Sequence, residues 1–562
     1  MKILILASSF SGLCQRVLRE LLVAGHHIEQ HYGMDPPRLR EQVARFHPHL
    51  IICPFLTHRI PDDIWQNHRC LIVHPGIEGD RGPSSLDWAI SGDKSYWGVT
   101  LLQADAEMDA GDIWDTEEFL VRGAGKTSIY KREVSAAAVR LIKHAITNAQ
   151  QPDFKPRPLD YRNPTVKGVL LDTMRQPDRK INWQQDSTRT VLQKIRAADT
   201  SPGVLDLVLG HEVFLYGPVE EPHLRGDPGE LLALAYGAAC IATKDGAIWI
   251  RQMKCRQDST LPSIKLSASQ VITALAPPEL SRRLNQVCSE TPNDIRVETR
   301  GSAAYIYFDF YNGAASTEQC KRLLETIRKV KKTPVKTLVF MGGEDFFSNG
   351  IHLNCIEAAK SPADESWANI NAIDDVVLEI INSPEHLTIA ALRNNAGAGG
   401  AILPLACDRV VIRDGVVLNP HYNNMGLYGS EYWTYLLPKK VGAELAFDLA
   451  RECEPMLAQE AFNYGLVDTL FEEDWDEFHH QLFELVERVS ADEDYQQALS
   501  VKQRERAAEE AEKPLQSYRQ QELEKMRATF YNPDSRYHRE RREFVYKGKV
   551  PAHLQEKEQA LT

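Results

Sequence analysis

A histidine and an aspartate in the first quarter of the chain have the types and surroundings of a proton-transfer pair. His74 directly follows the apolar run Cys70–Val73, and the sequence Pro75-Gly76 then turns the chain. Asp109 lies in the turn sequence Met-Asp-Ala-Gly-Asp, after the predicted strand Gly98–Gln103. In a parallel α/β sheet, catalytic side chains lie at the carboxyl ends of strands, so both residues are candidates for acid–base catalysis. The alternative is a purely structural histidine after a strand.

A second group of candidates lies in two glycine-containing stretches of the C-terminal half. They read Phe-Phe-Ser-Asn-Gly-Ile-His-Leu at 346–353 and Asn-Asn-Ala-Gly-Ala-Gly-Gly-Ala at 394–401. Gly-x-Gly-Gly suggests a nucleotide-binding loop, but Ile402 stands at the sixth position of that fingerprint, where glycine or alanine is needed. The alternative interpretation is two tight turns after strands.

The elements that would position His74 alternate between strand and helix. We predict strands over Lys2–Ala7, Leu50–Phe55 and Cys70–Val73, with a helix over Leu13–Leu22. This alternation favours a parallel sheet with right-handed crossovers. We therefore expect a Rossmann-like domain over residues 1–150, and a linker in the proline-rich stretch that follows, from Pro152 to Pro164.

Two further segments differ in character from the first. After a helical stretch around Ser187–Ala198, short strand-like runs separated by glycine and proline predict a small OB-like β-barrel over residues 165–275. Strands with helices between them begin again near residue 293 and predict an α/β domain over 293–550. The charged tail Val501–Arg542 predicts a long solvated helix, or two.

Composition limits the possible functions. The 562 residues are too many for one core, and about three or four domains are expected. A net charge of −13 argues against a broad nucleic-acid surface, although a local basic pocket can still hold an anion. Ten scattered cysteines without a C-x-x-C pair indicate reduced thiols in a cytoplasmic protein and no zinc site. Because no apolar run reaches the roughly 18 residues of a membrane helix, we expect no membrane association.

The segment around His74 resembles the formyltransferases that use 10-formyltetrahydrofolate. Five blocks match in order: His74, Arg81-Gly82, Trp88-Ala89-Ile90 with Gly92-Asp93, Gly98-Val99-Thr100 and Met108-Asp109-Ala110-Gly111-Asp112. The resemblance implies that His74 donates a proton and contacts the oxyanion, that Asp109 is a base or orients His74, and that Arg81 and Gly82 contact the folate. It continues into the predicted barrel at Lys180-Ile181-Asn182-Trp183, Ile195-Arg196-Ala197 and Pro202-Gly203.

The first segment departs from that family at one position. The family carries an asparagine two residues before its histidine, and this chain has Ile72 there. That asparagine donates a hydrogen bond to the oxyanion, and losing such a donor typically costs about 3–4 kcal/mol in the transition state. Either another donor replaces it, or the reaction is slow, or the formyl acceptor differs.

The two glycine-containing stretches resemble the crotonase (enoyl-CoA hydratase/isomerase) superfamily, whose fold is an α/β spiral. The matching residues are Phe347 to His352 (with His in place of Asp), the glycine run 397–400, Cys407-Asp408, Leu418-Asn419-Pro420, Gly426, Leu437-Pro438 and the terminal Phe544-Val545-Tyr546-Lys547. The resemblance implies that the N–H groups of Ile351 and Gly399 form an oxyanion hole for a coenzyme A thioester. Gly350, Gly400 and Lys547 are the implied contacts for that ligand.

The water-activating glutamates of the hydratases are missing. Their positions correspond to Ile402 and Tyr422, so we expect no ordinary enoyl-CoA hydratase. Candidate replacements are Tyr422 and the nearby Glu431. With an unperturbed pKa near roughly 10, a tyrosine is a poor base at neutral pH.

The fusion of these two modules resembles the hydrogenase maturation factors of the HypX/HoxX family. The resemblance implies formyl transfer from 10-formyltetrahydrofolate to coenzyme A, release of carbon monoxide from formyl-CoA, and its use as an iron ligand of a nickel–iron hydrogenase, with hydrogenase maturation proteins as partners. Two alternatives remain open. The product can instead be a formylated protein or formate, or the C-terminal half can be a non-catalytic acyl-CoA sensor.

Overall fold

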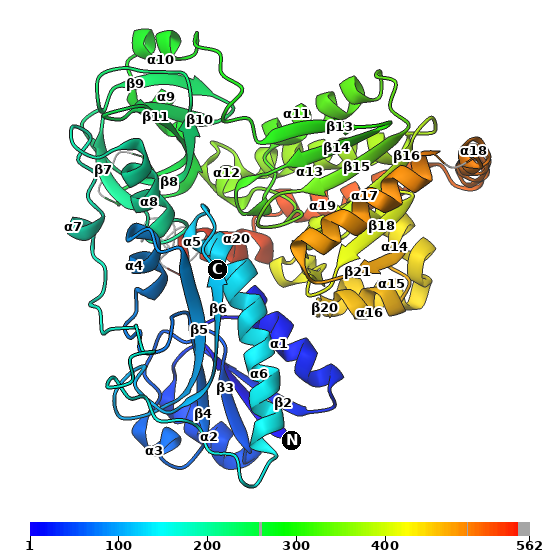
Figure 1. Cartoon of the computed structure of the whole chain (residues 1–562). Helices are drawn as coiled ribbons and strands as arrows, with labels where there is room; N and C mark the ends of the chain where they lie inside the picture. Colours follow the sequence, from blue (N-terminus) through cyan, green and yellow to red (C-terminus); the bar gives the residue numbers. More distant parts are fainter. Residues whose placement is uncertain (258–260, 492, 549–562) are drawn as a thin grey trace. The chain divides into compact units, whose positions relative to one another are not determined.

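The computed structural model divides into two compact units, Met1–Pro292 and Asn293–Thr562 (Figure 1). It describes residues 1–257, 261–491 and 493–548. Residues 258–260 of the predicted barrel, and residues 492, 549 and 550 of the predicted third domain, therefore lie outside the described residues.

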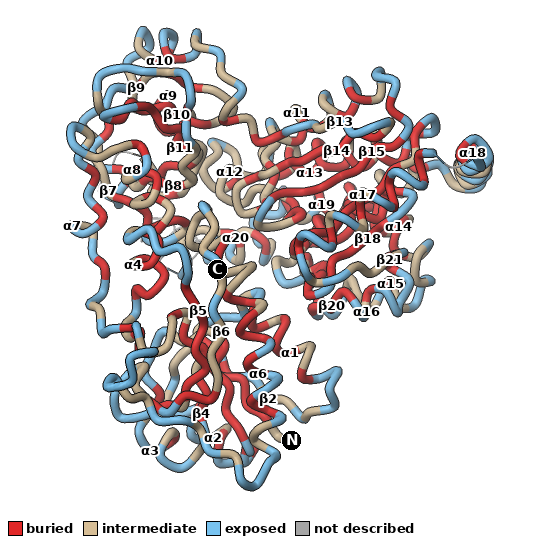
Figure 2. The backbone as a smooth tube through the Cα atoms, viewed as in Figure 1, coloured by how far each residue is buried: buried red, intermediate tan, exposed pale blue. Residues whose placement is uncertain are grey.

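The first sheet has the strand order β2-β1-β3-β4-β5-β6. Its strands are β1 (Lys2–Ala7), β2 (His27–Tyr32), β3 (Leu50–Cys53), β4 (Cys70–His74), β5 (Tyr96–Gln103) and β6 (Ile113–Leu120). Along β1, Ile3 and Ile5 belong to one core with helices α1 (Gly12–Val23) and α6 (Ser135–Ala149), whereas Leu4 and Leu6 belong to another with α2 (Pro36–Phe46). The alternation of side chains along a strand thus buries both faces of the sheet (Figure 2).

The prediction of a parallel sheet holds for β1 to β4 and is wrong for the next two strands. β5 runs antiparallel to both β4 and β6, with His74 opposite Thr100 and Leu71 opposite Gln103. The carboxyl end of β5 therefore lies beside the start of β4. The periodicity of an apolar run does not reveal strand direction, because side chains alternate in the same way in both kinds of pairing.

A six-stranded antiparallel sheet forms the rest of the first unit, in the order β7-β8-β11-β10-β9 with β12 paired to β11. Its strands are β7 (Val204–Val208), β8 (His211–Glu221), β9 (Leu231–Ala235), β10 (Ala238–Ala242), β11 (Ala247–Cys255) and β12 (Lys265–Ser267). Val204 of β7 and Leu231 of β9, from the two end strands, share one core cluster with helices α8 (Thr188–Ala197) and α9 (Ala268–Leu275). The sheet therefore encloses its core as a curled, barrel-like layer.

The proline-rich stretch predicted as a linker is packed against the first sheet. Arg157 and Ile113 exchange both backbone hydrogen bonds, and Arg157 also pairs with the Glu78 carboxylate. Further on, the N–H of Gly168 donates to the carbonyl of Glu78. Composition alone cannot distinguish a free linker from a segment packed along a sheet. Proline is compatible with both, because it lacks the backbone N–H that a regular strand needs.

The second unit is built on a sheet in the order β13-β14-β15-β16-β18-β21, parallel from β14 onward. The strands are β13 (Ile295–Arg300), β14 (Ala303–Phe308), β15 (Thr337–Gly342), β16 (Leu387–Leu392), β18 (Arg409–Arg413) and β21 (Thr469–Phe471). Helices α11 (Thr317–Val330) and α13 (Pro362–Ile381) pack on one face, and α17 (Trp475–Ala491) packs on the other (Figure 1). A small three-stranded sheet is formed by β17 (Ala396–Gly397), β19 (Val417–Asn419) and β20 (Met456–Leu457). These strands alternate along the chain with the last strands of the main sheet.

The C-terminal tail forms three helices, α18 (Tyr495–Glu512), α19 (Leu515–Tyr531) and α20 (Arg536–Tyr546). The prediction of solvated helices is wrong for α19, because Leu515, Met526 and Phe530 enter the main core of the unit. Buried Glu522 lies on the same helix. None of the helices in the described parts of the chain is long and apolar enough to cross a membrane.

Two candidate active sites

In the first unit, His74 lies between two carboxylates at the end of β4. Its Nε2 is 2.8 Å from Oδ2 of Asp80, and its Nδ1 is 3.7 Å from Oδ2 of Asp109. His74 and Asp80 are only 4% and 3% exposed. An imidazole with an acidic group near each ring nitrogen can hold a proton and deliver it to a reacting oxygen.

Two close backbone approaches shape this arrangement. A Cβ added to Gly76 would lie 2.4 Å from Oδ2 of Asp80 and 2.5 Å from Nε2 of His74, so only glycine fits there. Gly82 has a φ of +113°, and a Cβ there would lie 2.2 Å from the carbonyl oxygen of Leu171. Its N–H donates to Oδ2 of Asp109 at 3.2 Å.

The loop after β5 carries Asp109 back to His74. Because β5 ends beside the start of β4, the strand end itself cannot deliver the carboxylate. Arg81 holds the loop through bonds from Nε to the carbonyl of Met108 (3.1 Å) and from Nη2 to Glu107 (3.0 Å). The structure thus brings His74, Asp109, Arg81 and Gly82 together, and Arg81 contacts the catalytic loop.

Asp80 is the residue of this site that we did not predict from the sequence. Its signal was an acidic residue directly before Arg81-Gly82, in a loop that returns to the histidine. Ile72, which replaces the family's asparagine, lies on β4 opposite Leu102 and supplies no side-chain donor.

In the second unit, the two glycine-containing stretches lie side by side. Ser348 and Ala396 form a parallel bridge, and the N–H of Gly397 donates to the carbonyl of Ser348 at 3.0 Å. A Cβ on Gly400 would lie 2.0 Å from that same carbonyl, so a side chain cannot be accommodated there. A Cβ on Gly350, whose φ is +72°, would lie 3.2 Å from the backbone nitrogen of Gly399.

The N–H groups proposed for the oxyanion hole are unused by the fold. Gly399 is the second residue of the 3-10 helix Ala398–Ala401, where an N–H has no intrahelical acceptor. No acceptor among the residues that the structure describes receives the N–H of Ile351. Next to it, the N–H of His352 donates to Oδ1 of Asn369 at 2.9 Å, which fixes the turn. Two preorganised donors in this setting suit a thioester carbonyl.

Glu431 lies directly against this hole. A Cβ built on Gly399 would lie 1.9 Å from Oε1 of Glu431. The carboxyl group of Glu431 therefore packs directly against the Cα of Gly399. Glu431 is 2% exposed, and burial followed by the charge of Asp374 raises its pKa well above the usual glutamate range. A carboxylate of this kind is a strong base once ionised.

Tyr422 is also buried, and its hydroxyl finds no hydrogen-bond partner among the described residues. Burial, and then the nearby Glu431, raise the pKa of Tyr422 well above its ordinary value. It therefore stays protonated at neutral pH and can serve as a hydrogen-bond donor, whereas Glu431 is the better base.

Three other predicted positions have different surroundings. Ile402 is 1% exposed and lies in the hydrophobic core. His352 accepts from the N–H of Cys355 at 3.2 Å and begins helix α12 (Leu353–Ala358), and burial lowers the pKa of this neutral ring to about 4. Lys547 is exposed at the end of α20, and its predicted contact with the ligand stays a prediction.

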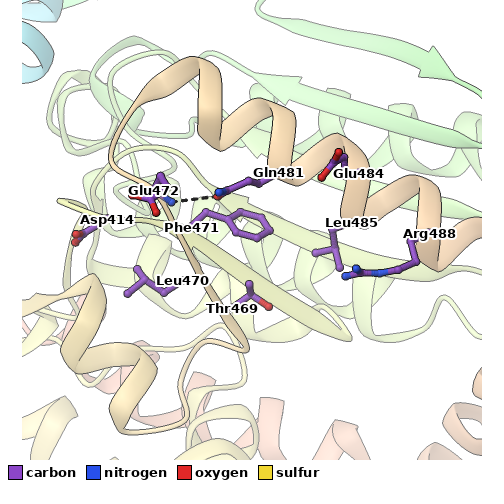
Figure 3. A pocket seen from close by; sticks show the side chains of 9 residues that line it. All are labelled: Asp414, Thr469, Leu470, Phe471, Glu472, Gln481, Glu484, Leu485 and Arg488. Carbon is purple, nitrogen blue, oxygen red and sulfur yellow. Dashed lines mark hydrogen bonds between the residues drawn. The ribbon is translucent and has the colours of Figure 1, made fainter.

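A separate pocket of about 480 Å³ is lined by the end of β21 and by α17 (Figure 3). The N–H of Glu472 donates to Gln481 at 3.2 Å within it. It contains none of the candidate residues above. Over the described parts of the chain, no group of three or more His, Cys, Asp or Glu side chains is arranged to hold a metal ion.

Known proteins match this chain over nearly its whole length. The family model "Formyl transferase, C-terminal domain" matches residues 173–266, and "Enoyl-CoA hydratase/isomerase" matches residues 311–551. The hydrogenase maturation factor HoxX of Bradyrhizobium diazoefficiens is 43% identical over 97% of this chain and 95% of its own length. The chain belongs to the HypX/HoxX family of hydrogenase maturation factors. A crystal structure of HypX from Aquifex aeolicus in complex with tetrahydrofolic acid has 44% identity and a TM-score of 0.92, covering 97% of this chain and 96% of that one.

This chain thus combines a formyltransferase-like region with a crotonase-like C-terminal domain, and these two domains indicate an enzyme. The α/β multidomain prediction is therefore confirmed, and so is the family resemblance.

Proposed function

We propose that this chain transfers a formyl group from 10-formyltetrahydrofolate to coenzyme A and then splits formyl-CoA into carbon monoxide and coenzyme A. The observation that carries the second step is the buried Glu431 carboxyl group against Gly399, beside two unused N–H donors. Since the chain belongs to a family of hydrogenase maturation factors, we propose that this carbon monoxide becomes a ligand of the iron in a nickel–iron hydrogenase.

The first step uses the site around His74. The relative from Aquifex aeolicus binds tetrahydrofolic acid, which supports folate as the formyl source. His74 protonates the leaving folate nitrogen or stabilises the tetrahedral oxyanion, and Asp80 and Asp109 hold its ring and its proton. The sulfur of the coenzyme A thiol attacks the formyl carbon, and the C–N bond to the folate breaks with its electron pair on nitrogen. The proton of the thiol passes through His74 to that nitrogen.

The second step removes the formyl proton and releases the thiolate of coenzyme A. The N–H groups of Ile351 and Gly399 bind the formyl oxygen. Glu431 takes the formyl proton, and the electron pair of that C–H bond remains on carbon. The C–S bond breaks with its electrons on sulfur, so carbon monoxide leaves. Glu431 then returns the proton to the thiolate, which regenerates coenzyme A.

Hydrolysis is the competing fate of formyl-CoA. Hydratases activate water with two glutamates, and here those positions hold the buried hydrocarbon of Ile402 and the protonated Tyr422. A thioester site without a water-activating carboxylate at these positions protects its ligand from conversion to formate.

The test is to give the purified chain 10-formyltetrahydrofolate and coenzyme A, and to measure carbon monoxide by its binding to reduced myoglobin. We expect carbon monoxide in proportion to folate consumed, and none from Glu431→Gln. Glu452→Gln, an exposed carboxylate 55% accessible on its side chain, is the matched control and should behave as wild type. Formate as the sole product, or tight coenzyme A binding with no turnover, rejects the proposal.

A further inference from the structure

We propose that Asp374 and Glu522 are positioning residues that clamp the turn Ser430–Thr434 and thereby present Glu431 to the thioester. This inference rests on the role proposed above for Glu431. Asp374 lies on α13 and Glu522 on α19, and both are fully buried. Neither belongs to the motifs by which the sequence resembles a crotonase.

The turn has a conformation that its own residues disfavour. Glu431 and Tyr432 are consecutive and have φ values of +62° and +60°. L-residues other than asparagine and aspartate rarely adopt this left-handed region, and two bulky residues in succession need outside contacts to stay there. Without such contacts, the turn would relax to a more favourable conformation, and the Glu431 side chain would no longer be held against Gly399.

Asp374 holds the first half of the turn. Its Oδ1 accepts the N–H of Glu431 at 2.9 Å, and both of its oxygens lie 2.9 Å from the hydroxyl of Ser430. The backbone of the catalytic residue is therefore bonded directly to a buried carboxylate. Bonds to a charged acceptor are about twice as strong as neutral ones, which fits a clamping role.

Glu522 holds the second half. Its Oε2 accepts the N–H of Tyr432 at 3.0 Å, and its Oε1 accepts the N–H and the hydroxyl of Thr434 at 2.8 and 2.5 Å. These groups begin helix α14 (Trp433–Val441), whose own N-cap residue, Tyr432, supplies no side-chain acceptor. Glu522 thus caps the helix from a distant segment.

The clamp also determines the charge around Glu431. The titratable groups facing it are Tyr422, Asp374, Glu522 and Cys320, and Arg519 lies beyond them, with Nε 3.9 Å from Asp374 and Nη1 2.7 Å from Asp375. Burial raises the pKa of Asp374 to about 6, and the charge of the Asp374 carboxylate in turn contributes to the raised pKa of Glu431. Removing this like charge lowers the pKa of Glu431.

The experiment compares Asp374→Asn with Asp375→Asn in the full chain, using carbon monoxide release from formyl-CoA as a function of pH. Asp375 is the matched control, because it is the next residue and pairs with the same arginine but makes no bond to the turn. For Asp374→Asn we expect kcat to fall by at least about tenfold, with KM for formyl-CoA changed by less than about threefold. The acidic limb of the profile should move to lower pH by roughly one unit. Asp375→Asn should follow the wild-type profile.

A profile of Asp374→Asn that coincides with wild type, or an equal shift in Asp375→Asn, overturns the proposal. If Asp374→Asn does not fold, Glu522→Gln decides, because one of its two oxygens remains an acceptor and the loss is confined to one side of the clamp. A kcat within about twofold of wild type for that variant also overturns it.

Failure of the proposed function is recognised separately. In that case wild type itself releases no carbon monoxide. Amide hydrogen exchange then tests the clamp alone: the N–H of Glu431 should exchange faster in Asp374→Asn than in Asp375→Asn, and equal rates refute the clamp.

Discussion

At the scale of single residues, the two ring nitrogens of His74 face different carboxylates at 2.8 and 3.7 Å. We predict that His74→Ala and Asp109→Ala each lower formyl transfer by at least about a hundredfold without unfolding the protein, because proton transfer in the transition state is lost. Consumption of 10-formyltetrahydrofolate measures this. His144→Ala removes an exposed histidine that pairs with Asp115 and should have no effect. Near wild-type turnover in either site variant would mean that the N-terminal site is assigned wrongly.

A substitution at Asp80 tests whether this carboxylate orients the ring of His74 for proton transfer. Asp80→Asn keeps the size of the side chain but removes the charge that holds Nε2 of His74. We expect a loss of roughly tenfold to a hundredfold in formyl transfer, from the energy of one buried hydrogen bond to a charged group. Single-turnover kinetics should show a slower chemical step with folate affinity retained. An unchanged chemical step would limit Asp80 to a structural role.

Ile402 and Tyr422 lead to a negative prediction. Neither can activate water, so the chain should not hydrate crotonyl-CoA above the buffer background, measured as loss of the absorbance of the conjugated thioester. An active enoyl-CoA hydratase assayed under the same conditions confirms that the assay works. Robust hydration by this chain would overturn the alignment of the second unit.

At the scale of elements, the oxyanion hole depends on the crossing of two glycine-containing turns. Gly399→Ala would place a methyl group 1.9 Å from Oε1 of Glu431, so either the carboxyl group or the turn must move. We predict a loss of at least about a hundredfold in carbon monoxide release. Gly301→Ala is the control, because Gly301 has a φ of +56° but no heavy atom within 4 Å of the added Cβ. Equal activity of the two variants would show that Glu431 does not work against Gly399.

At the scale of the whole molecule, the fusion of two modules in one chain predicts coupled reactions. Formyl-CoA is a reactive thioester that hydrolyses in water, so we expect it to pass between the steps without mixing with free formyl-CoA. The test supplies labelled 10-formyltetrahydrofolate together with an unlabelled pool of formyl-CoA. Early carbon monoxide should be mostly labelled. Dilution of the label in proportion to the free pool would show that the intermediate dissociates.

Local sequence patterns predicted many of the helices and strands and many of the candidate site residues. The strand Lys2–Ala7 and the position of His74 at the end of β4 follow from local apolar runs and turn residues, which act over a few positions. The pairing of the two glycine stretches was anticipated only through the resemblance to crotonases. Their close approach needs glycine, as at Gly400 against the carbonyl of Ser348.

The contacts that support those residues depend on packing between distant parts of the chain. No local pattern indicates the antiparallel direction of β5, the approach of Asp80 to His74, or the burial of α19 in the main core of the second unit. Asp374 is 57 positions from Glu431, and Glu522 is 90 positions from Tyr432. Contacts at such separations depend on the packing of whole helices. From the sequence, a charged residue on an amphipathic helix is predicted to be exposed to solvent, and only the packing shows that it is buried.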